Sequence, residues 1–269
     1  MAKPLELGGV AMSRPGEGIS GLTSRKESKT ADRFKSPLRY PGGKARAARH
    51  IATQLAAEAT HPSRLIASPF FGGGSVELRL AEMGYRVLGT DAFYPVARFW
   101  QALKHCPEEL HAASAEFLPG LDKESFKLLQ EELRFLNDTQ GDPMRTATLF
   151  FVVNRCSFSG TTLSGGMSPG CARFTQGSVD RLLQVDVSNV EVRHGDYWSH
   201  LLDPELGIPW AGIYADPPYC LEAGKNTLYG DKGSTHAAFD HDLFAARMRT
   251  LTGGESGVAT ASEEAAADG

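Results

Sequence analysis

The sequence has no long hydrophobic run, few cysteines and no large excess of charge of either sign. Within its 269 residues no apolar stretch approaches the roughly 20 residues of a membrane-spanning helix, and the first residues lack the uninterrupted apolar core of a secretory signal. The four cysteines stand at irregular spacings, so they form neither a C-x-x-C metal pair nor a disulfide framework. We therefore expect a cytoplasmic protein with reduced thiols, no metal ion and no membrane contact.

The net charge of -4 does not by itself indicate nucleic-acid binding, but the charge is distributed unevenly. Six basic residues and no acidic one lie between Arg33 and Arg49, whereas residues 251–269 hold acids and no base. A local basic surface can contact phosphate groups while the whole protein stays negative. On charge alone, a solvated basic helix face explains the pattern equally well.

The amino-terminal half alternates between helix and strand patterns. A helix is expected over 46–59, then a short apolar strand at 65–67, a glycine-rich turn, a helix at 76–83 and a second strand at 85–89 that leads to Asp91. Two strands joined through a helix in this way are parallel and need a right-handed crossover. The pattern therefore predicts an α/β fold with a parallel sheet.

Patterns typical of further elements follow along the chain. Helices are expected at 97–106 and 123–137, an irregular Gly- and Ser-rich segment at 154–177, strands at 190–192 and 212–215, and a helix at 241–249 capped by Asp240.

Functional residue types follow the predicted strands directly. The glycine turn at 72–74 follows the first strand, and Asp91, Asp196 and Asp216 follow the others. Ligands of open α/β sheets bind beyond the carboxyl ends of the strands, so these groups are expected to converge. The turn suits an anionic group and Asp91 suits ribose hydroxyls, although a flexible turn and a solvated acid are equally acceptable interpretations.

The Asp-Pro-Pro-Tyr sequence at 216–219 is the most specific motif. Two successive prolines remove two backbone donors and fix φ, which leaves carbonyl oxygens beside one carboxylate. An aromatic exocyclic amine is a poor nucleophile because its lone pair is delocalised into the ring. If the Asp216 carboxylate and the Pro217 carbonyl accept its two hydrogens, the nitrogen can pyramidalise and attack a methyl group in line. Tyr219 can stack on a base that has left the duplex; a Pro-rich turn with a solvated Asp is the alternative.

Three motifs in this order resemble those of the Dam-type DNA adenine methyltransferases: Tyr-Pro-Gly-Gly-Lys at 40–44, Pro-Phe-Phe-Gly-Gly-Gly-Ser at 69–75 and Asp-Pro-Pro-Tyr at 216–219. The resemblance implies a Rossmann-like S-adenosylmethionine-dependent methyltransferase sheet with an inserted, mainly helical target-recognition domain. It further implies site-specific transfer of a methyl group from S-adenosylmethionine to the amino group of adenine in double-stranded DNA. The choice of adenine over cytosine rests on the resemblance.

The composition of the two ends, the change of pattern along the chain and the resemblance together predict a domain organisation and a setting. The protein would be a monomer in a prokaryotic cell or a phage-infected host, with a cognate restriction endonuclease as a candidate partner. We expect a disordered arm at 1–32, the cofactor-binding part at 33–96, the target-recognition insertion at 97–185, the catalytic part at 186–250 and a disordered tail at 251–269.

The roles of individual residues follow from the same resemblance. Catalysis is expected of Asp216, Pro217, Pro218 and Tyr219. Cofactor binding, with Asp91 on the ribose and Asp196 on the adenine, is expected of Tyr40, Lys44, Phe71, Gly72, Gly74, Asp91, Asp196, Tyr197 and Asp216. DNA binding, through a loop that enters the duplex beside the target base, is expected of Asn154, Arg155 and Phe158.

The sequence departs from the family pattern at Ser68, where the family has an acid, and at Phe93, where it favours Asn. After the helix expected at 241–249 the family continues through strands that complete its sheet, and here an acidic Ala- and Gly-rich tail follows. We therefore expect the carboxyl-terminal strands to be missing. Two alternatives stay open: a truncated remnant that binds DNA or cofactor without turnover, and a methyltransferase that acts on RNA or on a protein amide.

Overall fold

The computed structural model of the chain describes residues 32–59, 61–118, 120–202, 209–219 and 239–251. These residues belong to one compact unit that begins at Asp32. The predicted arm, apart from Asp32, and the predicted tail, apart from Leu251, lie outside the described residues, as does the prediction of missing carboxyl-terminal strands. None of the helices in the described segments is both long and apolar enough to cross a membrane.

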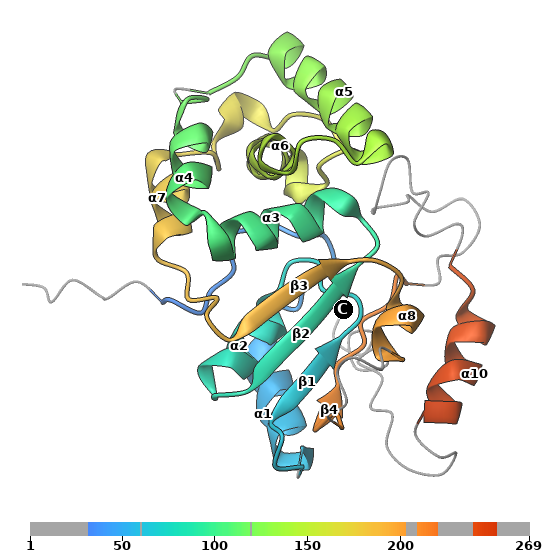
Figure 1. The fold of residues 1–269 in the computed structure, drawn as a ribbon. Coiled ribbons are helices and arrows are strands. Elements are labelled where there is room, and N and C mark those ends of the chain that lie inside the picture. Colours follow the sequence, from blue (N-terminus) through green and yellow to red (C-terminus); the bar gives the residue numbers. More distant parts are fainter. Residues whose placement is uncertain (1–31, 60, 119, 203–208, 220–238, 252–269) are drawn as a thin grey trace, which may run out of the picture. The chain divides into compact units, whose positions relative to one another are not determined.

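A parallel sheet forms the centre of the described structure (Figure 1). Its strands are β1 (Leu65–Ser68), β2 (Arg86–Asp91), β3 (Val190–His194) and β4 (Gly212–Ile213), in the order β3-β2-β1-β4. Strand β1 pairs in parallel with both β2 and β4, and β2 pairs in parallel with β3. The predicted α/β fold with a parallel sheet is therefore confirmed.

The central strand β1 is buried along its whole length. Its side chains alternate between two clusters, with Ile66 in the main core and Ala67 in a smaller cluster on the other face. A parallel strand buried on both faces reads as a continuous apolar run. This is why so short a strand could be recognised in the sequence.

Helices cover both faces of this sheet. Helices α1 (Ala48–Glu58) and α2 (Ser75–Glu82) pack on each other, and α2 contacts β2. Helices α8 (Tyr197–Leu201) and α10 (His241–Leu251) contribute the apolar side chains of the smaller cluster on the opposite face. The sheet thus lies between helical layers, as a parallel sheet requires.

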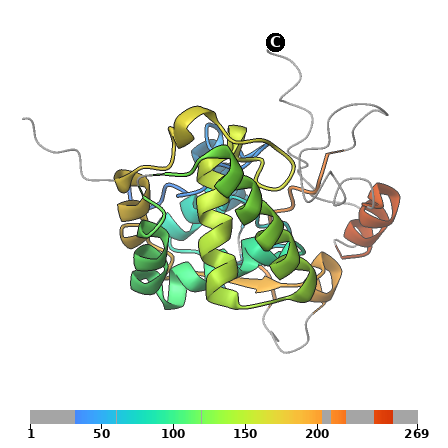
Figure 2. The same cartoon turned by 90° about the horizontal axis from the view of Figure 1, so that it is seen from above.

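The chain between β2 and β3 is mainly helical. It forms α3 (Tyr94–His105), α4 (Pro107–Ala115), α5 (Lys123–Thr139), α6 (Pro143–Cys156) and α7 (Gln176–Asp180). Helix α3 packs on β3 and α6, and α6 packs on α4 and α5, as Figure 1 and the turned view in Figure 2 both show. Short 3-10 turns occupy Phe158–Gly160, Pro169–Cys171 and Arg181–Leu183.

Capping residues explain where the two longest helices of this group begin. Asp122 accepts a hydrogen bond from the Ser125 N–H at 2.7 Å and so caps α5. Asp142 accepts one from the Arg145 N–H at 2.5 Å and caps α6, whose first residue is Pro143. Helix α6 is buried on most of its surface, so its sequence lacks the polar face that marks an amphipathic helix.

Most predicted elements are confirmed, and most differences fall in the helical segment. Outside it, α8 was not predicted and β4 is shorter than the strand expected at 212–215. The helices expected at 46–59, 76–83 and 123–137 correspond to α1, α2 and α5. Asp240 caps α10 as predicted, because it accepts from the Leu243 N–H at 2.8 Å. Helices α4 and α6 were not predicted, and the segment expected to be irregular from Asn154 begins within the last turn of α6. The predicted domain boundary before residue 97 falls inside α3.

The cysteines within the described residues are free thiols. Cys106 is exposed, and Cys156 and Cys171 are buried. Cys220 lies outside the described residues. The prediction of unpaired thiols is confirmed for these three.

Phe71 packs directly on Gly89 of β2. A Cβ atom at Gly89 would lie 2.1 Å from Cδ2 of Phe71. The Phe71 ring also meets Trp100 edge-on with 5.1 Å between centroids, and Trp100 donates from Nε1 to the Gly72 carbonyl at 3.0 Å. These contacts hold the glycine-rich turn against the sheet.

Replacing Gly89 with alanine should therefore lower the free energy of unfolding by about 1–3 kcal/mol, because strand and ring must move apart. The control is Gly177→Ala in α7, where an added Cβ meets no atom within 4 Å, and stability should be unchanged or slightly higher. Urea unfolding followed by circular dichroism measures both variants. Equal stability of Gly89→Ala and the unchanged protein would refute this packing.

Candidate functional site

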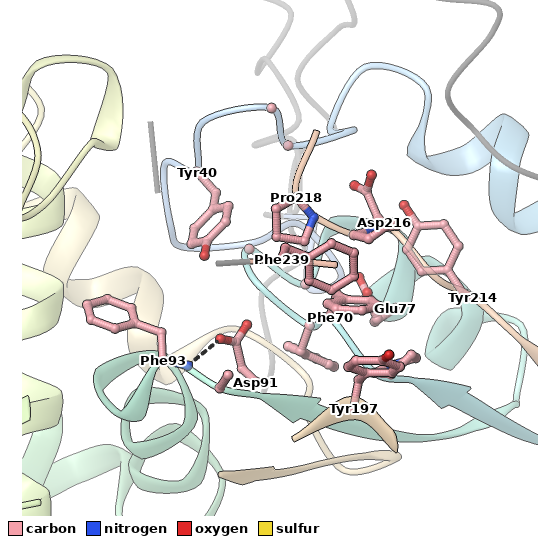
Figure 3. A pocket seen from close by; sticks show the side chains of 18 of the residues that line it. Tyr40, Phe70, Glu77, Asp91, Phe93, Tyr197, Tyr214, Asp216, Pro218 and Phe239 are labelled. Atoms are coloured by element: carbon pink, nitrogen blue, oxygen red, sulfur yellow. Dashed lines mark hydrogen bonds between the residues drawn. The ribbon is translucent and has the colours of Figure 1, made fainter. Parts of the chain in front are cut away.

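A cavity of about 530 Å³ lies at the carboxyl ends of β1, β2 and β4 (Figure 3). This is within the roughly 300–1,000 Å³ of small-molecule sites. Among the predicted cofactor-binding residues, Gly72 is absent from the cavity lining, and among the predicted catalytic residues Tyr219 is absent from it. The predicted residues that do line it are Tyr40, Lys44, Phe71, Gly74, Asp91, Asp196, Tyr197, Asp216, Pro217 and Pro218.

Tyr40 lies over the glycine-rich turn. A Cβ atom at Gly72 or Gly73 would lie 2.9 or 2.7 Å from atoms of Tyr40. Gly72 and Gly74 have φ of 48° and 65°, a left-handed conformation that favours glycine. Gly74 is also the N-cap of α2, so the amino-terminal end of this helix borders the cavity, which suits a negatively charged ligand group.

Asp91 is partly buried at the end of β2 and holds the adjoining backbone. Its Oδ2 accepts from the Gly72 N–H at 2.8 Å and its Oδ1 accepts from the Phe93 N–H at 2.9 Å. Burial raises the pKa of Asp91 to about 6, and the two backbone hydrogen bonds oppose this shift. Each carboxylate oxygen has a second lone pair, so Asp91 can still accept a hydrogen bond from a ligand hydroxyl.

Lys44 and Asp216 form an ion pair at the Asp-Pro-Pro-Tyr corner. Lys44 donates from Nζ to Oδ1 and Oδ2 of Asp216 at 2.8 and 2.9 Å, and also to the Tyr219 hydroxyl. Its Nζ lies 4.9 Å from the centroid of the Tyr219 ring. Burial opposes the charge of Lys44, but the hydrogen bonds to Asp216 and Tyr219 outweigh it and raise the pKa of Lys44. The structure thus brings residues 172 positions apart into contact.

Aromatic side chains form one wall of the cavity. Tyr197 stacks on Phe70 with 5.3 Å between ring centroids and an interplanar angle of 28°, and Phe239 lies 5.5 Å from Phe70. Arg247 of α10 donates to the Tyr197 hydroxyl oxygen at 3.0 Å. These aromatic rings offer a largely apolar surface of the kind that binds a purine ring.

Asp196 lies at the edge of this wall and caps α8. Its Oδ1 accepts from the Trp198 N–H at 2.9 Å and the Ser199 N–H at 3.4 Å. Capping fixes the orientation of the carboxylate. The same carboxylate borders the cavity, so one of its oxygens can face a ligand while the other caps the helix.

Glu77 is a buried acid that sequence reasoning missed. It is the third residue of α2, and only 2% of it is exposed. Its Oε1 accepts from Ser68 Oγ at 2.7 Å. Burial raises the pKa of Glu77 to about 7; backbone and Ser68 hydrogen bonds oppose the shift, and the charge of Asp216 adds to it. Tyr214, also buried, has a raised pKa from burial and from the nearby charges of Glu77 and Asp216.

The residues predicted to bind DNA lie outside the cavity lining and differ in exposure. Asn154 is fully buried, and its side chain bonds the Arg39 N–H at 3.0 Å and carbonyl at 2.7 Å. It is therefore not placed to reach DNA in this structure. Arg155 donates from Nε and Nη2 to the Arg173 carbonyl at 2.9 and 2.6 Å. Phe158 is 65% exposed and is the one of the three that presents its side chain fully to solvent.

Arg39, Arg155 and Arg173 lie near one another beside the loop that follows α6. Burial, together with the charges of Arg39 and Arg173, lowers the pKa of Arg155 to about 10. Burial and Arg173 likewise lower the pKa of Arg39, whose Nη1 donates to the Ser157 carbonyl at 3.2 Å. Like charges held together in this way favour a bound anion.

Several further cavity residues could not be assigned from the sequence. Phe70 lies inside the recognised motif at 69–75 and Tyr214 lies two residues before the motif at 216–219, and these positions are the signal that could have identified them. Glu77 offers a weaker signal, an acid two residues after the Gly-Gly-Gly-Ser turn. Phe239 and Arg247 come from the predicted carboxyl-terminal helix and the residues before it, and nothing local marks them. Among the described residues, no three His, Cys, Asp or Glu side chains are grouped to hold a metal ion.

A family model described as D12 class N6 adenine-specific DNA methyltransferase matches residues 40–265, which is more than half of the chain. A comparison with individual curated proteins gives no match. The matched range includes every described residue that lines the cavity.

The raised pKa of Glu77 predicts a pH-dependent cost to stability. The pKa is about 7 in the folded protein against an ordinary value of 4.5. Between these values the folded protein binds more protons than the unfolded chain, so the free energy of unfolding falls as the pH rises through this window. Glu77→Gln removes this titration. The stability of the variant relative to the unchanged protein should therefore rise between pH 4 and pH 8, by at most about 3 kcal/mol.

Urea unfolding at a series of pH values measures this difference. Asp91 titrates in both proteins, so its contribution cancels in the comparison. Glu82→Gln, at the carboxyl end of the same helix, is the matched control and should show no such trend. A difference for Glu77→Gln that is constant between pH 4 and pH 8 would argue against a buried, protonatable Glu77.

Proposed function

The chain belongs to the D12 class of N6 adenine-specific DNA methyltransferases, and from this premise we propose that its cavity binds S-adenosylmethionine beside Asp216. The enzyme methylates adenine in DNA. The observation that carries the proposal is the meeting of the glycine-rich turn, Asp91 and the Asp-Pro-Pro-Tyr corner around one cavity. We propose further that the reaction takes place in the cytoplasm of a prokaryotic cell or of a phage-infected host.

The residues around the cavity fit S-adenosylmethionine. The volume of about 530 Å³ is in the range of small-molecule sites. The aromatic wall of Phe70, Tyr197 and Phe239 matches a flat adenine ring. Asp91 matches ribose hydroxyls, and the cation of Lys44 matches the carboxylate of the amino-acid end.

Asp216 and Pro217 would hold the amino group of the target adenine. When bound, S-adenosylmethionine supplies an electrophilic methyl group on a positively charged sulfur. The Asp216 carboxylate and the Pro217 carbonyl would each accept one hydrogen of the amine. The lone pair would then leave conjugation with the ring and point at the methyl carbon. After transfer the nitrogen carries a positive charge and releases one proton, for which Asp216 is the adjoining acceptor.

Lys44 would orient the carboxylate at this corner. It donates to both oxygens of Asp216, and a carboxylate can accept hydrogen bonds at each of its oxygens. Each oxygen keeps a further lone pair that can accept a hydrogen of the target amine. A ligand carboxylate near Lys44 would compete for the ammonium and leave more of these acceptor sites open.

DNA would approach over the loop that follows α6. Phe158 is exposed and lies on this loop, and apolar side chains of this kind insert between bases. The adjoining cluster of Arg39, Arg155 and Arg173 suits phosphate groups. Helices α3 to α7, which cover most of the segment predicted as an insertion, would carry target recognition and thereby give the enzyme its site specificity.

Asp216→Ala should lower the rate of methyl transfer by about 100-fold or more, because one of two acceptors for the amine is lost. Transfer of labelled methyl from S-adenosylmethionine to unmethylated plasmid DNA measures the rate. Asp186→Asn, at a surface ion pair with Arg33, is the control and should retain full activity. Binding of S-adenosylhomocysteine by the Asp216→Ala variant excludes loss of folding as the cause. A variant as active as the unchanged enzyme would overturn the proposed chemistry.

Phe158→Ala should weaken binding to unmethylated plasmid DNA at least about 5-fold, the effect of losing about 1 kcal/mol of base contact. Phe135 on α5 is an equally exposed phenylalanine, with 65% of each exposed, so Phe135→Ala is the matched control. Fluorescence anisotropy with labelled DNA fragments measures both. An equal effect of the two substitutions would remove Phe158 from the DNA interface.

A further inference from the structure

Glu77 has no part in the chemistry assigned above, yet it reaches the cavity. Its neighbours Val76 and Leu78 in α2 are buried and apolar, as is Leu80. An acid among them is costly to bury, because a carboxylate loses its hydration in the interior. Buried charges are therefore usually paired or specifically hydrogen-bonded.

The carboxyl group of Glu77 is held in place but its charge is not neutralised. Ser68, the last residue of β1, is fully buried and donates to Glu77 at 2.7 Å. The backbone N–H groups of Val76 and Glu77 also favour the carboxylate. No cationic side chain of the described residues pairs with it, and the charge that acts on it, that of Asp216, is repulsive.

Glu77 and Asp216 lie at the same side of the cavity, opposite Asp91. Figure 3 shows Glu77, Tyr214 and Asp216 on one side and Asp91 with Phe93 on the other. The nearby cation, Lys44, is bound to Asp216. This side therefore carries two carboxylates and one ammonium, and the ammonium of a ligand would find in Glu77 a carboxylate that Lys44 does not bind.

We propose that Glu77, oriented by Ser68, binds the ammonium group at the amino-acid end of the methyl donor. The inference rests on the proposed function, because it places that end of S-adenosylmethionine beside Asp216 and Lys44. Glu77 and Lys44 then form complementary partners for a zwitterion: the carboxylate of Glu77 for the ammonium, and the ammonium of Lys44 for the carboxylate. Glu77 is thus a specificity-determining residue.

A purely structural role predicts different behaviour. A glutamate at the third position of a helix can stabilise the helix start through the backbone N–H groups. In that role Glu77→Gln would affect all ligands of the cavity alike, through the position of α2. In the proposed role the substitution discriminates between ligands that have an ammonium group and those that lack one.

Three adenosine ligands separate these possibilities in calorimetric titrations. S-adenosylhomocysteine has both the ammonium and the carboxylate, decarboxylated S-adenosylmethionine has the ammonium and a sulfonium but no carboxylate, and methylthioadenosine has neither an ammonium nor a carboxylate. Glu77→Gln should weaken the first two by about 10- to 100-fold, the loss of a charged hydrogen bond, and leave methylthioadenosine within 2-fold. Lys44→Met should weaken S-adenosylhomocysteine and leave decarboxylated S-adenosylmethionine and methylthioadenosine within about 3-fold. Glu82→Gln, in the same helix, should change none of them.

The titrations distinguish failure of the role proposed for Glu77 from failure of the proposed function. If the unchanged protein binds none of the three ligands, the proposed cofactor cavity fails. If it binds S-adenosylhomocysteine and Glu77→Gln weakens all three ligands equally, or weakens none, the role of Glu77 fails while the cavity assignment stands. Normal binding of methylthioadenosine by the variant shows that the fold is intact, so a selective loss with the ammonium ligands supports the proposal.

Discussion

The parallel pairing of β1 between β2 and β4 is the constraint on which the site depends. In this register Ile66 lies opposite both Val87 and Gly212. The carboxyl ends of three strands that are distant in the sequence therefore open on one side, as expected for an open parallel sheet. One part of the site follows each strand: the glycine-rich turn after β1, Asp91 at the end of β2 and the Asp-Pro-Pro-Tyr corner after β4. Phe71 holds the glycine-rich turn in place, because its ring packs on Gly89.

Charge at this edge is balanced by few groups. Asp91, Glu77 and Asp216 all border the cavity, and burial raises the pKa of the first two. Lys44 pairs with Asp216, whereas Glu77 is hydrogen-bonded by Ser68 and backbone N–H groups. The site therefore holds more carboxylates than cationic groups, and its hydrogen-bond acceptors outnumber its donors. Both properties favour a ligand that carries positive charge and polar hydrogens, which agrees with a sulfonium methyl donor and an amino group as substrate.

The sequence was informative where local pattern and chemistry coincide. Strands β1 and β2 and the turn between them follow from a buried apolar run, glycines and a strand-end acid, and the family match agrees with the motifs in that order. Burial, by contrast, could not be inferred from residue type. Asn154 has the polarity of a DNA-contacting residue but satisfies backbone groups in the interior. Glu77 reads as a solvated acid at a helix start, and α6 shows no amphipathic period because nearly all of it is enclosed.

The most direct test of the cavity assignment is a crystal structure of the protein with S-adenosylhomocysteine. The account predicts the ligand in the cavity, its ribose hydroxyls on Asp91, its adenine against Tyr197 and its sulfur facing the Asp216 corner. Its ammonium would contact Glu77 and its carboxylate Lys44. A ligand bound elsewhere, or bound with its sulfur turned away from Asp216, would contradict the account.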